Sequence, residues 1–306
     1  MTCAEAGVGP HVVTSSFHVQ KAGNAPEENE DAFAFADTAR RLAIADGASD
    51  SYDSGRWAHL LTAAFVASAP PASPGGVRAW LDEPARAWLA GLRYEALPWN
   101  QQAKARLGAH CTLLGVEIDL LPEHSATHGT PCGAWRALAV GDCCLFQVRA
   151  GDLIAAFPLA SAAEFGSSPP LLTTNPAYRG AGVEQLVTAG GELRVGDTLL
   201  LATDALAQWF LRCHEQGERQ WRDLPAGRDV IAFIAEQRSQ RRLRNDDVTM
   251  LVARIVAGRA RPSPATGNAI VLKGLSDRWL SAGYGAEERG LGTAPSPDAP
   301  APIGAP

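Results

Sequence analysis

Aspartates stand at the ends of apolar segments throughout this 306-residue chain. The aspartates in such positions are Asp31, Asp46, Asp142, Asp204, Asp246 and Asp247. A single acid beside a buried strand is usually a turn former or a helix cap. If the strands are neighbours in one sandwich, however, these carboxylates gather at one edge and repel one another unless a cation lies between them. Oxygen-only clusters suit Mg²⁺ or Mn²⁺, so the pattern predicts a site for hard divalent ions.

Two such ions would favour hydrolysis of a phosphoester. Bridged by a carboxylate, they would lower the pKa of a shared water and hold a phosphoryl group for in-line displacement. Zinc is not expected, because the cysteines show no CxxC spacing and His124 and His128 lie in a polar loop. Cys143 and Cys144 are interpreted as core cysteines rather than a redox switch, because strand alternation would bury one of the two thiols and free cysteine is commonly buried. No GxSxG, P-loop or GxGxxG motif occurs.

Acidic motifs follow one another in a fixed order between residues 11 and 256: Glu30-Asp31, Asp46-Gly47, Gly141-Asp142, Thr203-Asp204 and Asp246-Asp247-Val248-Thr249. In this order and spacing the chain resembles the metal-dependent serine/threonine protein phosphatases of type 2C, particularly bacterial members. The resemblance implies an α+β fold, an α/β/β/α four-layer sandwich of two antiparallel sheets flanked by helices. It also implies two Mg²⁺ or Mn²⁺ ions at one end of the sheets, with a third, looser ion as an option.

The resemblance also implies which residues bind the ions, directly or through water. They are Glu30, Asp31, Asp46, Gly47, Asp142, Asp204 and Asp246. Asp46 would bridge two ions, Gly47 would use its carbonyl oxygen, and Asp142 would bind the third ion. Glu30 and Asp31 would act mostly through ordered water, and Asp46 with Asp31 would be the catalytic residues. The implied substrate is phosphoserine or phosphothreonine on a regulatory protein, either a kinase or a kinase substrate.

Three positions depart from the family's pattern. Pro26 stands where the family usually has an arginine that holds the substrate phosphate, and Lys21 is a candidate substitute. Ala48 replaces the candidate general-acid histidine of many eukaryotic members, so water would protonate the leaving group. Ala205 replaces a glycine near the site. Two alternatives therefore stay open: a pseudophosphatase that binds a phosphoprotein or kinase without turnover, and a phosphatase acting on small phosphoesters.

Four arginines, Arg238, Arg241, Arg242 and Arg244, end a predicted helix just before Asp246. They could draw a phosphorylated substrate toward the ions. Alternatively, they simply face the negative end of the helix dipole. The sequence leaves both interpretations open.

Apolar periodicity predicts the elements that position these residues. Strands are expected at 12–20, 32–35, 42–46, 111–120, 134–142, 144–149, 153–157, 196–204 and 247–256. Helices are expected at 52–65, at 77–92 with a break at Pro84, at 205–214 and at 228–244. Loops are expected at 68–76 and 158–182. The paired strands 32–35 and 42–46 should bring Asp31 and Asp46 close together.

Composition excludes several classes of protein. The formal net charge of −6 argues against a nucleic-acid binder. No segment approaches the ~18 apolar residues of a membrane span, and the N-terminus lacks the features of a signal peptide, so a cytoplasmic protein is expected. Residues 1–257 are predicted to form the catalytic domain, and 258–306, rich in Gly, Pro, Ala and Ser, a largely disordered tail. Within that tail, 270–280 could dock on the domain or on a partner.

Overall fold

The first of two large antiparallel sheets contains the strand on which the chain enters the fold. The computed structural model describes residues 9–36, 40–121, 128–222, 224–225, 227, 229–257 and 271–272. The strands of this first sheet, in spatial order, are β1 (His11–Val19), β12 (Val248–Val256), β11 (Thr198–Ala202), β7 (Cys144–Arg149) and β8 (Asp152–Phe157). The central strand β11 is buried along most of its length, as its continuous apolar run predicts.

The second sheet contains the hairpin that is flanked by the first acidic motifs. Its strands, in spatial order, are β10 (Val187–Arg194), β6 (Pro131–Val140), β5 (Leu113–Leu120), β3 (Arg41–Ala45), β2 (Ala32–Ala36) and β13 (Val271–Leu272). Two short strands, β4 (His110–Cys111) and β9 (Leu172–Thr173), pair with each other.

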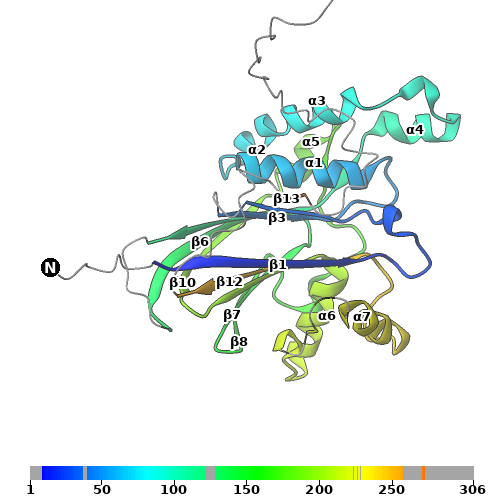
Figure 1. The fold of residues 1–306 in the computed structure, drawn as a ribbon. Helices are drawn as coiled ribbons and strands as arrows, with labels where there is room; N and C mark the ends of the chain where they lie inside the picture. The colour runs from blue at the N-terminus through cyan, green and yellow to red at the C-terminus, as the bar shows by residue number, and fades with distance from the viewer. Residues whose placement is uncertain are drawn as a thin grey trace, which may run out of the picture.

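Helices cover the outer face of each sheet (Figure 1). On the side of the second sheet lie α1 (Ser54–Ala67), α2 (Pro74–Trp80), α3 (Asp82–Ala90), α4 (Trp99–Leu107) and α5 (Arg179–Val183). On the side of the first sheet lie α6 (Asp204–Glu215) and α7 (Asp229–Ser239). The short 3₁₀ segments are η1 (Pro26–Glu28), η2 (Tyr94–Ala96), η3 (Ala162–Glu164) and η4 (Gln220–Arg222). The predicted α+β sandwich of four layers is therefore confirmed.

Three apolar cores separate the four layers, and strand β2 shows how one short sequence serves two of them. Phe33 and Phe35 face the core between the sheets. Ala32 and Ala34 face the opposite way, into the core that contains Trp57 of α1. Successive side chains of a strand point to opposite faces, and the small alanines let the helix approach closely. The third core fills the space between the first sheet and the helices α6 and α7.

Strand register sets the position of the acidic residues. In the β2–β3 hairpin Ala32 lies opposite Ala45, so Asp31 and Asp46 flank the same end of the pair, as predicted. In the first sheet Ala202 of β11 lies opposite Met250 and Cys144. The chain therefore leaves β11 and enters β12 and β7 at one end of that sheet.

Several element boundaries differ from the predictions. The break between α2 and α3 falls at Leu81, because Pro84 occupies the first turn of α3, where a missing N–H costs no helical hydrogen bond. The segment 74–76, expected in a loop, opens α2, with Ser73 accepting a hydrogen bond from the N–H of Gly76. Helix α7 ends at Ser239 rather than at 244, so three of the four arginines lie in the loop that follows.

Other elements went unpredicted. Helix α4 is largely exposed and lacks an apolar stripe. The expected loop at 158–182 contains η3, β9 and most of α5. Strand β10 has small and polar residues in place of a clear apolar alternation.

Part of the C-terminal segment adds to the second sheet. Val271 pairs with Phe35, so β13 extends the sheet beyond β2, in agreement with docking on the domain. The rest of 258–306 lies outside the described residues. Within the described part of the chain, no helix combines the length and the apolar character needed to cross a bilayer.

Candidate metal centre

Where the β2–β3 hairpin ends, Asp31 is buried and Asp46 is half-buried. The N–H of Asp46 donates to Oγ1 of Thr112 at 3.0 Å, and the Thr112 N–H donates to the Asp46 carbonyl at 2.9 Å. Thr203, which follows β11, donates its hydroxyl to Oδ2 of Asp31 at 2.9 Å and so joins the two sheets. The other carboxylate oxygen of Asp31 is buried without a hydrogen-bond partner. The Asp46 carboxylate has no hydrogen bond or ion pair to any described residue.

Carboxylates from both sheets are close enough to affect one another's ionisation. Burial raises the pKa of Asp46 well above its usual value, and Asp31, Asp204, Asp142 and Asp246 raise it further. Burial likewise raises the pKa of Asp142 to about 7, with a further contribution from Asp204. The structure therefore brings together five of the sequence-predicted residues, and Asp46 lies among the other four.

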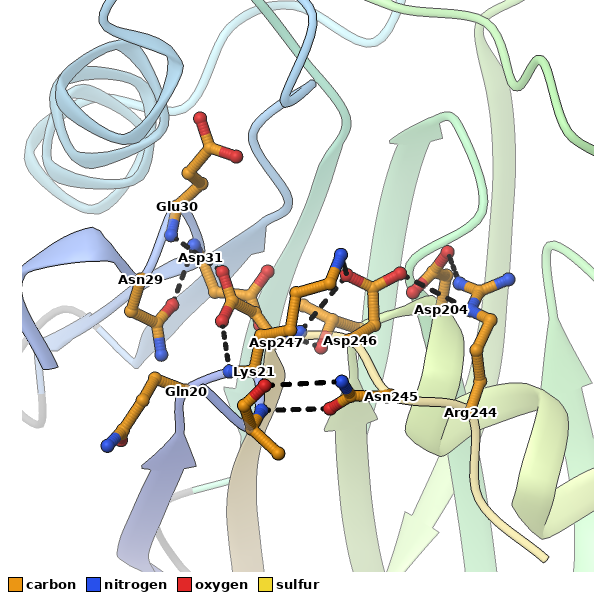
Figure 2. Close-up of polar contacts among 12 residues, drawn as sticks. Gln20, Lys21, Asn29, Glu30, Asp31, Asp204, Arg244, Asn245, Asp246 and Asp247 are labelled. Carbon is orange, nitrogen blue, oxygen red and sulfur yellow. Dashed lines mark hydrogen bonds and ion pairs between the residues drawn. The ribbon is translucent and has the colours of Figure 1, made fainter. Parts of the chain in front are cut away.

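Asp204 and Asp246 share a cation from the chain itself (Figure 2). The guanidinium of Arg244 donates to Oδ2 of Asp204, and its Nε lies 3.3 Å from Oδ2 of Asp246. The Nζ of Lys21 lies 3.5 Å from the other oxygen of Asp246. Burial raises the pKa of Asp204, and Arg244 opposes that rise. Arg244 thus supplies positive charge at the exposed side of the cluster.

Two acids near the cluster have structural partners. Asp247 accepts hydrogen bonds from the N–H groups of Lys21 at 2.7 Å and Glu30 at 2.9 Å, so both of its oxygens hold the loop before β2. The carboxylate of Glu30 accepts a hydrogen bond from the Ser54 hydroxyl. Figure 2 shows that this carboxylate points away from Asp31 and the other acids.

Gly47 is packed too tightly for any other residue. A Cβ atom at this position would lie 2.8 Å from the carbonyl oxygen of Glu30 and 3.0 Å from Cβ of Ser54. The glycine therefore lets the end of β3, the loop before β2 and the start of α1 meet directly beside Asp46.

The donors of this cluster fit hard divalent ions in their chemistry. They are all oxygens, and Asp31 and Asp142 each present a buried carboxylate oxygen without a hydrogen-bond partner. Over the ranges that the structure describes, however, no three or more His, Cys, Asp or Glu side chains stand at the spacing of a metal-binding group. The carboxylates of Asp204 and Asp246 are instead paired with Arg244, whose positive charge neutralises part of the negative charge of the cluster.

Replacing Arg244 by alanine is expected to tighten Mn²⁺ binding about fivefold, because the ion would no longer compete with the guanidinium for Asp204 and Asp246. The same change should slightly destabilise the metal-free protein, since the two acids would lose their partner. Titration calorimetry with Mn²⁺ and thermal unfolding in EDTA measure the two effects. Arg219→Ala, which removes an exposed ion pair with Asp152, is the matched control. Equal or weaker Mn²⁺ binding by Arg244→Ala would contradict the competition.

The sequence predicted the acids better than the residues that hold them. Thr203 and Arg244 were not expected to contact Asp31 and Asp204, because these contacts join segments far apart in the chain. Pro26 is exposed in η1, and its side chain has neither a charge nor a hydrogen-bond donor with which to hold a phosphate.

The remaining candidate residues have ordinary surroundings. Cys143 and Cys144 are both buried, which confirms the interpretation as core thiols, although strand alternation was expected to bury only one of them. His128 is exposed, as expected, and His124 lies outside the described residues. Ala205 is buried in α6.

No protein-family model matches the chain, and no curated protein matches it. Among solved structures, the fold is similar to PppA of Pseudomonas aeruginosa, a regulatory component of T6SS, at 22% identity over 80% of this chain and 98% of that chain, with a TM-score of 0.46. The catalytic domain of the serine/threonine phosphatase PstP in complex with two manganese ions is 19% identical over 81% and 99%, with a TM-score of 0.48. The serine/threonine phosphatase Stp1 of Staphylococcus aureus is 12% identical over 84% and 100%, with a TM-score of 0.49.

Proposed function

We propose that this chain is a Mg²⁺- or Mn²⁺-dependent phosphatase that removes phosphate from serine or threonine of a regulatory protein, a kinase or a kinase substrate. The observation that supports it is the meeting of five mutually repelling carboxylates at one end of the sandwich. Such a cluster costs stability, and a hard cation is its natural partner. Two bound ions would supply an activated water and positive charge toward the phosphoryl oxygens.

Asp46 would hold the ions at the centre, because its carboxylate is surrounded by the others and makes no other polar contact within the described residues. The Gly47 carbonyl would bind one ion beside it. Asp204 and Asp246 would bind from the first sheet, once Arg244 has released them.

Asp31, Glu30 and Asp142 would complete the site less directly. The unpartnered oxygen of Asp31 is suited to accept a hydrogen bond from an ordered water. Glu30, held by Ser54, would reach the site only through water. Asp142 would bind the optional third ion. We assign the activity to residues 1–257, with 258–306 as an appended tail.

Hydrolysis of p-nitrophenyl phosphate and of a phosphothreonine peptide, measured with Mn²⁺ and with EDTA, tests the proposal. Turnover that requires the metal supports it. Absence of turnover at saturating Mn²⁺, in protein shown to be folded, would refute it. Metabolite phosphates assayed at the same concentrations decide whether the substrate is a protein or a small phosphoester.

The alternative is a pseudophosphatase that binds a phosphoprotein or kinase without turnover. Two observations favour it: Pro26 leaves no arginine at the usual phosphate-holding position, and Arg244 already neutralises part of the cluster. Calorimetric titration with Mn²⁺ on the same preparation separates the two functions. A phosphatase should bind two ions, whereas a binding module should bind them weakly or not at all.

A further inference from the structure

Beside the acidic cluster lies a cavity of about 390 Å³ whose charge has the opposite sign. Of the eight residues lining it, four are arginines and none is acidic. The arginines are Arg212, Arg238, Arg241 and Arg244. On a chain with a formal net charge of −6, such a concentration of positive charge needs its own explanation.

The fold itself explains two of these arginines. Arg238 donates to the carbonyls of Gln20 at 2.9 Å and Asp246 at 2.6 Å, so it joins the end of α7 to the loops around β1 and β12. Arg212 of α6 donates to the carbonyl of Arg242. The carbonyl oxygens accept these hydrogen bonds without neutralising the charge of the guanidinium groups.

Arg241 has no structural role of this kind. It follows α7 with a left-handed backbone, at φ 56°, and its side chain is exposed. Its side chain makes no hydrogen bond or ion pair to any described residue. The helix-dipole interpretation accounts poorly for Arg241, because the residue lies beyond the last turn of α7.

The cavity adjoins the metal centre directly. Arg244 belongs to both, since it lines the cavity and contacts Asp204 and Asp246. Two further lining residues, Ala205 and Asn245, are the chain neighbours of those aspartates. If the phosphoryl group of a substrate lies at the carboxylate cluster, the substrate residues on either side of the phosphorylated residue would therefore lie near the arginines.

We propose that this arginine-lined cavity is a subsite for an acidic group, a carboxylate or a second phosphate, that flanks the phosphorylated residue of the substrate. The inference rests on the proposed phosphatase function and adds a preference for acidic sequences to it. Guanidinium groups form strong charge-assisted hydrogen bonds with carboxylates and phosphates. A second anchor of this kind would also help to position a substrate that Pro26 cannot hold.

Binding of two fluorescent phosphothreonine peptides, measured by anisotropy in EDTA, tests the inference without turnover. One peptide carries glutamates on both sides of the phosphothreonine, and the other carries glutamines at the same positions. We expect the glutamate peptide to bind about tenfold more tightly, and the preference to shrink with added salt. General repulsion by the net negative chain would produce the opposite order.

Arg241→Asn should reduce the preference about fivefold, as expected for the loss of one exposed charge contact. Asparagine suits this position because it tolerates a left-handed backbone. Gln208→Glu, which adds a negative charge to the cavity lining, should reduce the preference by a second route. The matched control is Arg93→Asn. Arg93 is exposed on the side of the second sheet, and its side chain has no partner among the described residues.

Equal affinity of the wild-type protein for both peptides would overturn the inference, as would a preference that survives both Arg241→Asn and Gln208→Glu. The result is separable from the proposed function. Metal-dependent hydrolysis without a preference for the glutamate peptide overturns only the subsite. A preference that depends on Arg241, in a protein without hydrolysis, refutes only the proposed turnover.

Discussion

Replacing Asp46 by asparagine should lower Mn²⁺-dependent turnover of p-nitrophenyl phosphate by about 10³-fold while raising the melting temperature of the metal-free protein. The loss has the size seen when a group that stabilises transition-state charge is removed. The gain follows because the half-buried Asp46 carboxylate is repelled by four other acids and makes no compensating polar contact within the described residues. A neutral amide of the same shape removes that repulsion.

The expected gain in the free energy of unfolding is about 1–2 kcal/mol, the usual range for relief of an unfavourable functional residue. For a domain of this size that corresponds to several degrees in melting temperature. Stopped assays and calorimetric unfolding in EDTA measure the two effects. Mn²⁺ should stabilise the wild-type protein much more than Asp46→Asn.

Asp119→Asn is the matched control for this prediction. Asp119 lies exposed on β5 in the same sheet, and its side chain has no polar partner among the described residues. Its replacement should change neither activity nor stability appreciably. Unaltered turnover in Asp46→Asn would remove Asp46 from the centre of the site, and a lower melting temperature would show that its charge is compensated.

Strand-end acids could be predicted from the sequence because local rules determine their positions. The alternating and continuous apolar runs fix where β2, β3 and β11 lie, and antiparallel pairing then places Asp31 beside Asp46. The layers followed from the same patterns, since each of these three strands presents apolar side chains to two cores.

Contacts between distant segments could not be predicted in this way. The end of α7 is one case: Arg238 reaches the Gln20 carbonyl 218 residues away, and the chain turns at Arg241 instead of continuing the helix. Asp247 is a second case, because the sequence alone does not show which of two adjacent aspartates, Asp246 or Asp247, belongs to the site. Only the hydrogen bonds from Lys21 and Glu30 show that Asp247 serves the fold.

Without metal, the protein should lose stability as the pH rises from 6.5 to 8. The folded-state pKa of Asp142 is about 7, and burial together with neighbouring acids raises the pKa values of Asp31 and Asp46 well above normal. An acid whose pKa is raised by folding binds more protons in the folded state than in the unfolded state. Its stabilising contribution is therefore complete below the unfolded pKa of about 4 and is lost as the pH rises through the folded pKa.

Three histidines act in the opposite direction at lower pH. Loss of solvation lowers the pKa of His18 and His110, and it lowers that of His59 to about 4. Because the folded state binds these protons less tightly, the histidines make the protein more stable as the pH rises toward their unfolded-state pKa of about 6.5. This gain in stability is nearly complete above that pH. The window from 6.5 to 8 therefore isolates the carboxylates. Each additional proton held by the folded state corresponds to about 1.4 kcal/mol per pH unit.

Saturating Mn²⁺ should abolish this fall, because the ion replaces the protons that otherwise neutralise the carboxylates. Thermal unfolding in EDTA and in Mn²⁺ across the window measures the difference. Asp142→Asn should flatten the EDTA profile, whereas Asp119→Asn should leave it unchanged. A flat profile for the wild-type protein in EDTA would mean that the acids are already neutralised by Arg244 and Lys21, and that the cluster has no unmet demand for a divalent ion.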